Sequence, residues 1–227
     1  MADFRLRVTY AETGRLVMLS HLEIARALER AVRRAGLPYA VSQGFSPHMK
    51  QAFGSALPVG VGGLEEIFDV SLTDYVPPEE ALARLQASSA PDLMPHAARY
   101  ITKDETAASA AYPRSTYEAL LEASRSGDCE MGVLAAARAL SVPSEIMVVR
   151  KKKERVLVPS EFIVGEFEVE PAELGEEGQE RALLRFTLES KASGSLRPDM
   201  LLEHMLADSG LRAASILRTK QSEIPKE

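Results

Sequence analysis

The order of predicted strands and helices limits the fold of this chain most, because a similar order occurs twice. Residues 4–10 (FRLRVTY) alternate in polarity and are rich in β-forming side chains, which indicates a strand. A helix is predicted over 20–36, because Ser20 and Glu23 have the spacing of a capping box and Gly36 stands at a stop position. The rest of the first set comprises predicted strands at 39–44, 67–74 and 96–102 and a predicted helix at 77–90.

The second set follows residues 102–113 (TKDETAASAAYP), which are small, polar and weakly patterned and are therefore predicted to be a linker. The second set comprises a strand or short helix at 115–123, a helix at 131–141, a strand or hairpin at 145–159, strands at 164–171, 182–190 and 211–219, and a helix at 197–210. Two split β-α-β units account for the length of 227 residues. We therefore expect an α+β protein made of two ferredoxin-like sandwiches in tandem, at 1–101 and 114–227, joined by the linker 102–113.

Composition narrows the class of protein. The chain has no run of about 18 apolar residues, so a membrane span is not expected. The first ten residues lack an apolar signal core, so the expected compartment is the cytoplasm. The single cysteine, Cys129, excludes an intramolecular disulfide and a cysteine-rich metal site. Neither a nucleotide-binding glycine signature nor a metal-ligand spacing occurs, so no cofactor and no metal are expected.

Charge is distributed unevenly along the chain. The net charge is −6, which argues against general nucleic-acid binding. Residues 1–60 nevertheless hold eight Lys or Arg against four Asp or Glu, and residues 141–160 hold five against two. These two basic islands stand in an otherwise acidic chain, and local patches rather than totals attract polyanions.

The segment SQGFSPHMKQAFGSALPVGV, residues 42–61, has the most unusual composition in the sequence. Its glycines and prolines impose unusual backbone angles and alternate with side chains that can bind a ligand. Those side chains are Gln43, Ser46, His48, Lys50 and Gln51. We expect a structured loop and strand that lie beside the arginine-rich helix and take part in binding.

This segment, together with LSHLE at 19–23 and the stretches RKKKERVLVP and SGSLRPDMLLEHML, resembles the radical SAM-linked protein family. That family is an uncharacterised domain fused to, or encoded beside, radical SAM proteins. The chain departs from its pattern at Glu23, Ser46 and Met49, where the family has Asp, Asn and Pro. The resemblance implies a radical SAM protein as partner, and the chain lacks the CxxxCxxC triplet of a radical SAM enzyme itself.

At the level of fold alone, the chain is also similar to the RNA-processing endonucleases of CRISPR systems, which pair ferredoxin-like halves. This analogy carries little functional weight.

The first basic island places three arginines on one face of the helix predicted at 20–36. Arg26, Arg30 and Arg33 are spaced by four and three residues. Arginine binds phosphate through two parallel hydrogen bonds, so this face suits an RNA. The alternative is an ordinary solvated face on which Glu29 pairs with Arg33.

The second basic island is RKKKER at 150–155. Its cations are Arg150, Lys151, Lys152, Lys153 and Arg155. On an exposed strand or hairpin tip they suit a phosphate backbone. The alternative is an edge strand that lysines protect against aggregation.

Two histidines could carry chemistry. His21 begins the helix, and His48 stands in the glycine- and proline-rich loop. Together they could cleave RNA by general acid–base catalysis without a metal. Alternatively, they only fix local structure, and we expect His48 to form hydrogen bonds within its own loop. The expected function is a non-catalytic module that works with a radical SAM enzyme and holds a tRNA or rRNA. The alternatives are a metal-independent endoribonuclease and a protein adaptor that binds no nucleic acid.

Overall fold

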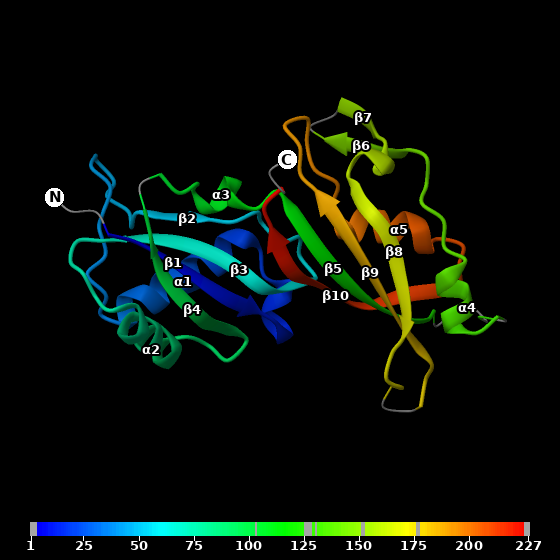
Figure 1. Ribbon diagram of the computed structural model, residues 1–227, viewed down its shortest axis with the longest axis horizontal. Helices are drawn as coiled ribbons and strands as arrows, with labels where there is room; N and C mark the ends of the chain where they lie inside the picture. Colours follow the sequence, from blue (N-terminus) through cyan, green and yellow to red (C-terminus); the bar gives the residue numbers. More distant parts are fainter. Residues whose placement is uncertain are drawn as a thin grey trace. The chain divides into compact units, whose positions relative to one another are not determined.

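The computed structural model of the protein describes residues 4–102, 104–124, 129, 131–150, 153–175 and 178–224. It contains two compact units (Figure 1). Unit 1 comprises Met1–Tyr112 and Gln221–Glu227, and unit 2 comprises Pro113–Lys220. Both units combine strands with helices, which confirms the α+β class. No helix in the described ranges is long and apolar enough to cross a membrane.

Unit 1 is built on an antiparallel sheet with the strand order β4-β1-β3-β2. Its strands are β1 (Phe4–Glu12), β2 (Gln51–Phe53), β3 (Val61–Leu72) and β4 (Leu93–Ile101). A 3-10 helix, η1 (Gly14–Met18), and helix α1 (His21–Arg34) connect β1 to β2, and α2 (Pro78–Ser88) connects β3 to β4. This is the strand order of a split β-α-β unit, so it supports the ferredoxin-like assignment of this half, which stays a prediction.

One face of the unit 1 sheet carries the hydrophobic core. Because side chains alternate along a strand, Leu6 and Val8 of β1 point to the same face, where they are fully buried with Phe68 of β3. Helix α1 packs its apolar stripe on this face, with Ile24 and Leu28 each 1% exposed. The alternating pattern of residues 4–10 thus positions the arginines of β1 on the opposite face.

Helix α1 begins at the predicted capping box. The backbone N–H and the hydroxyl of Ser20 both donate to Glu23 Oε2, at 2.8 and 2.7 Å. These hydrogen bonds, first the one from the hydroxyl, lower the pKa of Glu23 below its ordinary value. The stability that the cap contributes is therefore complete at pH values above the ordinary carboxyl pKa. It is lost as the pH falls through the lowered pKa of Glu23.

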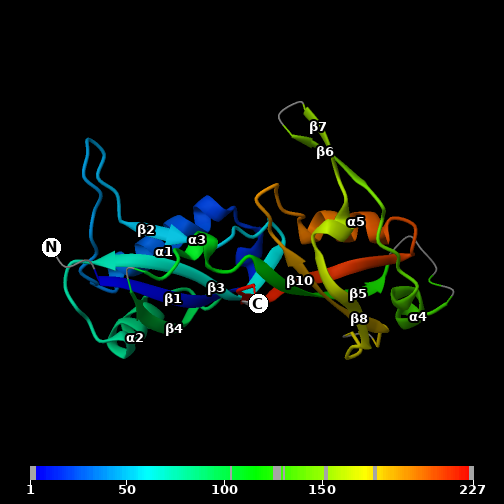
Figure 2. The same ribbon diagram turned by 45° about the horizontal axis from the view of Figure 1, so that its top comes forward.

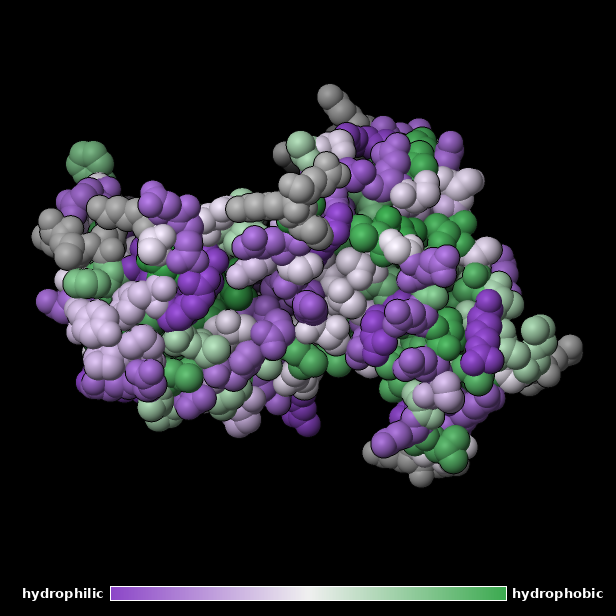
Figure 3. Space-filling model, in the orientation of Figure 1, coloured by the Kyte–Doolittle hydropathy of each residue, from purple (hydrophilic) through white to green (hydrophobic). Residues whose placement is uncertain are grey.

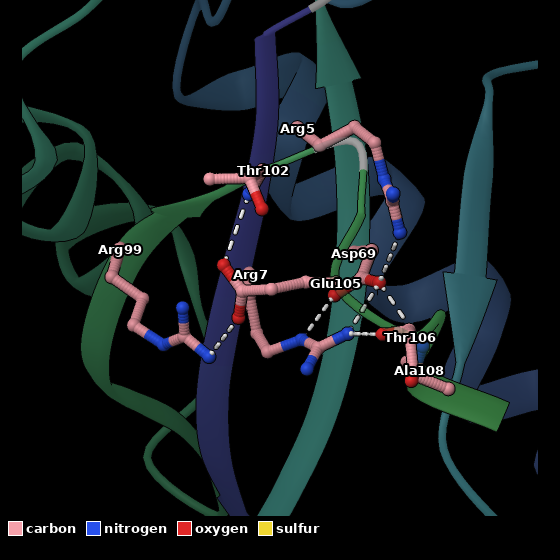
Figure 4. A network of polar contacts seen from close by, with 8 residues as sticks. All are labelled: Arg5, Arg7, Asp69, Arg99, Thr102, Glu105, Thr106 and Ala108. Atoms are coloured by element: carbon pink, nitrogen blue, oxygen red, sulfur yellow. Dashed lines mark hydrogen bonds and ion pairs between the residues drawn. The ribbon is translucent and has the colours of Figure 1, made fainter. Parts of the chain in front are cut away.

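The second face of the unit 1 sheet is closed by a buried ion pair (Figure 4). Arg7 of β1 lies directly opposite Asp69 of β3, and its Nε and Nη2 donate to the two carboxylate oxygens at 2.7 and 2.9 Å. Both side chains are 5% exposed. The hydrogen bond to Asp69 raises the pKa of Arg7 further above its ordinary value, so the guanidinium stays charged.

The same pair holds the chain that follows β4. Arg7 Nη2 donates to Thr106 O at 2.8 Å, and Asp69 Oδ2 accepts from the backbone N–H of Ala108 at 3.1 Å. Ala108 begins the short helix α3 (Ala108–Ala111). On the same face, Arg99 Nη2 lies 2.8 Å from Glu105 Oε2. Residues 104–111, within the stretch predicted as a linker, are thus packed on unit 1.

Unit 2 has the same order of main strands and helices as unit 1, with an additional hairpin inserted. Its elements are β5 (Arg114–Ala123), α4 (Val133–Arg138), β6 (Ile146–Arg150), β7 (Lys153–Leu157), η2 (Pro159–Glu161), β8 (Ile163–Pro171), β9 (Arg181–Glu189), α5 (Pro198–Leu206) and β10 (Leu211–Ser222). The strand order is β10-β5-β9-β8, while β6 and β7 form a separate two-stranded sheet. This hairpin is inserted between α4 and β8, and the ferredoxin-like assignment of this half also stays a prediction.

The sheet of unit 2 has a core face and an opposite face that carries charged pairs. Tyr117, Ala119 and Leu121 of β5 are buried, whereas Arg114, Glu118 and Glu122 lie on the opposite face. The cross-strand pairs are Arg114–Glu189, Glu118–Arg185 and Glu122–Arg181. Figure 3 shows hydrophilic side chains over these strands with hydrophobic ones between them. The arginines of this face are therefore neutralised by carboxylates of the same sheet.

We expect Asp69→Ala to lower the free energy of unfolding by about 3–5 kcal/mol, because it leaves the buried Arg7 without a counter-charge. Replacing both partners, as Arg7→Met with Asp69→Leu, should recover most of this loss. Urea denaturation followed by circular dichroism measures the change, and hydrogen exchange of the β1 and β3 amides locates it in unit 1.

The matched control is Glu80→Ala, which breaks the exposed pair of Glu80 with Arg84 and should cost about 0.5 kcal/mol or less. A loss in Asp69→Ala as small as that of the control would contradict the role given to the buried pair.

Candidate functional site

The glycine- and proline-rich segment forms a projecting loop rather than the strand predicted at 39–44. Figure 2 shows the chain between α1 and β2 standing away from the sheet of unit 1. Tyr39 and Val41 form only isolated bridges, with Leu72 and Met49, and the strand β2 begins at Gln51. The prediction of a strand at 39–44 was wrong because the backbone bonds to β3 only at Tyr39 and Ala40 and turns into the loop after Val41. Gly44 has a φ of 141°, a conformation that favours glycine.

Ser42 and His48 close the base of this loop. The Ser42 N–H donates to the carbonyl of His48 at 2.8 Å, and the His48 N–H donates to Ser42 Oγ at 3.1 Å. The imidazole Nδ1 lies 2.9 Å from the same Ser42 Oγ. The prediction that His48 forms hydrogen bonds within its own loop is confirmed.

Closing the base turns the tip of the loop outward. Gln43, Phe45 and Ser46 are all exposed, and the ring of Phe45 is fully so. A fully exposed phenylalanine buries none of its apolar surface within the protein, which is unusual for a large aromatic side chain. The loop therefore presents one aromatic ring flanked by two hydrogen-bonding side chains.

A cavity of about 290 Å³ lies beside the base of the loop. It is lined by Arg5, His48, Met49, Lys50, Gln51, Ala52, Asp69 and Ser71. Arg5 lies directly opposite Ser71 across β1 and β3, and the Ser71 N–H donates to the carbonyl of Lys50 at 3.0 Å. Arg5, Ser71 and Lys50 thus form one row across three neighbouring segments.

The balance of charge in this cavity is positive. Its single carboxylate, Asp69, is bound by Arg7 and also lies 3.4 Å from Nη2 of Arg5. Arg5 remains 24% exposed and Lys50 is exposed, so both cations are accessible to solvent. A guanidinium, an ammonium and a hydroxyl in one row are suited to a phosphate group. The site can bind an anion at the base of a loop that carries an aromatic ring.

Sequence reasoning found Lys50 and His48 but missed Arg5 and Ser71. The alternation in FRLRVTY was a usable signal, because it puts Arg5 on the face opposite Leu6. The strand register that places Ser71 between Arg5 and Lys50 had no signal in the sequence.

The three arginines predicted as a binding face on α1 are all exposed, but they differ in their contacts. Arg33 donates to Glu29 at 2.7 Å and to the Tyr39 hydroxyl at 2.6 Å, and its guanidinium lies 4.8 Å from the Tyr39 ring centre. Its pKa is raised, chiefly by the hydrogen bond to Glu29. Arg26 places its charge near Glu23, and Arg30 forms no hydrogen bond or ion pair with the described residues. Arg33 thus has a structural role, while Arg26 and Arg30 point to solvent.

His21 and His48 line different cavities. The His21 ring packs edge-on against Phe53, with ring centres 5.3 Å apart, and lines a much smaller cavity with Glu12 and Glu66. Acid–base cleavage needs two titratable groups that reach one phosphodiester. This arrangement does not place the two histidines around one substrate position.

The second basic island falls at the β6–β7 hairpin of unit 2. The hairpin is one of the two alternatives predicted for 145–159. Arg150 ends β6, Lys153 begins β7, and the side chain of Arg155 is exposed. Lys151 and Lys152 lie outside the described residues, as do the side chains of Arg150 and Lys153.

Within the described ranges, no group of three or more His, Cys, Asp or Glu side chains is placed to hold a metal ion. The other two histidines, His96 and His204, each lie within hydrogen-bonding distance of a backbone carbonyl oxygen. His96 Nε2 is 2.9 Å from Leu64 O, and His204 Nδ1 is 3.0 Å from Met200 O.

Comparison with known proteins identifies a family but no activity. The model of a family described as an uncharacterized protein conserved in bacteria (DUF2344) matches residues 5–198. No curated protein matches the chain. A crystal structure of an unknown protein from Galdieria sulphuraria aligns with 99% of this chain and 100% of its own, at 13% identity and a TM-score of 0.26. That score is too low for any structural argument.

We expect His48→Ala to speed hydrogen exchange at the Ser42 amide and to lower the free energy of opening the loop by on the order of 1 kcal/mol. The reason is that the imidazole and the Ser42 hydroxyl share one hydrogen bond at the base of the loop. Hydrogen exchange read by NMR measures the effect.

Ser42→Ala should speed hydrogen exchange to a similar extent. The double variant should lower the free energy of loop opening by less than the sum of the two single variants, because both changes remove the same contact. Additive effects of the two substitutions would contradict the proposed closure.

Proposed function

The chain belongs to the family of uncharacterized proteins conserved in bacteria (DUF2344), and we propose that it is a non-catalytic module that holds RNA for a radical SAM enzyme. The observation that carries the RNA part is the position of the cationic cavity at the base of the loop that exposes Phe45. Single-stranded RNA is bound by this combination, since bases stack on aromatic rings while cations contact the phosphates.

The loop suits an unpaired nucleotide better than a double helix. One ring at a narrow tip stacks with one base, and the neighbouring Gln43 and Ser46 can donate to and accept from a base edge. Arg5 and Lys50 can then contact an adjacent phosphate. Arg26 and Arg30 on α1 supply further cations to the same unit. The target is therefore a loop, bulge or end of a structured RNA such as tRNA or rRNA.

The link to a radical SAM enzyme is supported by the sequence resemblance of residues 42–61 and of the second half of the chain. A module that holds the RNA substrate would let a separate enzyme carry the cofactor and the chemistry. The two histidines lie in different cavities, which favours a binding role over catalysis.

We expect Phe45→Ala to weaken the binding of a single-stranded RNA by about fivefold to 150-fold, the usual range for the loss of one base–aromatic stack. Phe45→Tyr should retain binding because it keeps the ring, whereas Phe45→Leu should lose it although the side chain stays apolar. Fluorescence anisotropy with labelled tRNA fragments measures the affinities.

Lys50→Ala should weaken the same binding and reduce the slope of log K against log salt by about 0.7, the value for one lost phosphate contact to a single strand. The matched control is Arg84→Ala, which removes one exposed cation from α2 and should leave both quantities unchanged. Equal effects of the two substitutions, or no RNA binding by the wild-type protein, would favour a protein adaptor instead.

Incubation of the purified protein with tRNA and rRNA in EDTA should yield no cleavage, because His21 and His48 line different cavities and do not share one substrate position. Gel analysis of end-labelled RNA measures this. Cleavage that disappears in His21→Ala or His48→Ala, with folding intact, would establish an endoribonuclease and overturn the non-catalytic assignment.

A further inference from the structure

A cavity in unit 2 has no part in the proposed function. It has a volume of about 290 Å³ and lies where α4, α5 and the strands β8 and β9 meet. Leu184 of β9, which is only 1% exposed, forms part of its wall. The cavity therefore reaches the core of the unit.

The length of α4 explains why this space is left open. The helix has six residues and spans about 9 Å, whereas β8 has nine residues and spans about 30 Å. The helix contacts β5, β8 and β9, but it is too short to cover the whole length of β8. Phe167 and Val169 of β8 consequently remain partly exposed.

The walls of the cavity are mainly apolar. Val169 lies opposite Leu184 in the sheet, and both side chains line the cavity. The ring of Phe167 also lines it and packs edge-on against the ring of Phe186, with ring centres 5.6 Å apart. Met205 of α5 closes the side that faces the helices. Such walls favour an aliphatic or aromatic body over a polar one.

Among the described residues, the cavity is lined by one cation and by no carboxylate. The cation is Arg138 at the end of α4, whose exposed side chain forms no hydrogen bond or ion pair within the described ranges. Glu168 of β8 points to the other face of the sheet, because side chains alternate along a strand, and it pairs there with Arg185 at 2.8 Å. The guanidinium of Arg138 is therefore available to an anionic ligand.

A neighbouring cavity of about 410 Å³ gives the ligand a direction. It shares Leu140 and Met205 with the first cavity. Its ionisable lining residues in the described part of the chain are Asp208 and His204, and the Nδ1 atom of His204 lies 3.0 Å from a backbone carbonyl oxygen. A carboxylate placed there would meet the like charge of Asp208. The anionic group of a ligand is thus directed to Arg138.

We propose that the cavity of unit 2 binds a small molecule that joins a carboxylate to an aliphatic body. The carboxylate accepts two parallel hydrogen bonds from the guanidinium of Arg138, and the aliphatic body lies against Phe167 and Val169. The volume is near the lower end of the range of roughly 300–1,000 Å³ for ligand sites, so the ligand is small. This goes beyond the proposed function, because it gives unit 2 a ligand that does not depend on RNA binding by unit 1.

The test titrates the full chain with sodium octanoate and follows the methyl signals of Leu184 and Met205 by NMR. Octanoate should shift these signals with a dissociation constant of about 1 mM or below, as expected for a ligand of about ten non-hydrogen atoms. Octylammonium has the same chain and the opposite charge. It should bind at least about tenfold more weakly, because it cannot accept hydrogen bonds from a guanidinium.

Two substitutions test the two parts of the site. Arg138→Gln should weaken octanoate binding by about tenfold or more, because the charge-assisted hydrogen bonds are lost. Val169→Phe keeps a strand-forming side chain, fills part of the cavity and should weaken binding to a similar extent. The matched control is Arg155→Gln, which removes another exposed cation of unit 2 and should leave octanoate binding unchanged. Circular dichroism confirms that each variant is folded.

Three outcomes would overturn the proposal. The first is the absence of octanoate binding to the wild-type protein, and the second is unchanged binding in Arg138→Gln. The third is tighter binding of an acetylated tetrapeptide that ends in Leu, which would make the occupant the end of a protein chain. No RNA is present in these titrations, so failure of this proposal is distinguishable from failure of the proposed function.

Discussion

The buried pair of Arg7 and Asp69 is the interaction on which the second face of unit 1 depends. It joins β1 to β3 and holds the segment that follows β4 through Thr106 and Ala108. It also determines the charge of the candidate site. Because Arg7 binds both carboxylate oxygens of Asp69, this carboxylate does not fully neutralise Arg5, which also lines the cavity. The charge of the candidate anion site therefore depends on this pair.

Much of the fold could be predicted from local patterns, because those patterns report which side chains must be buried. The capping box at Ser20 and Glu23 and the alternation of residues 4–10 lead directly to α1 and β1. A strand was expected at 39–44 because the side chains there favour one. The backbone groups instead form isolated bridges and hydrogen bonds within the loop. Propensity describes side chains and does not say where the backbone finds its partners.

The candidate site was predicted only in part, for a related reason. The loop residues were found because glycine and proline mark unusual backbone, and the bond from His48 to Ser42 followed from the need of such backbone for side-chain partners. Arg5, Ser71 and Asp69 come together through the register of β1 with β3, whose paired residues are more than 60 positions apart in the chain. Register depends on packing across the sheet, and no single segment reports it.

The arrangement of positive charge distinguishes a sheet face that is neutralised internally from a site that suits an anion. On the sheet of unit 2, Arg114, Arg181 and Arg185 each face a carboxylate of the neighbouring strand, so that face attracts neither phosphate nor carboxylate strongly. Positive charge reaches solvent at the loop cavity through Arg5 and on α1 through Arg26 and Arg30. The exposed ring of Phe45 stands on the loop above this cavity, which suits a base. Specificity then comes from the neutral neighbours of the cations, because charge alone would attract any anion.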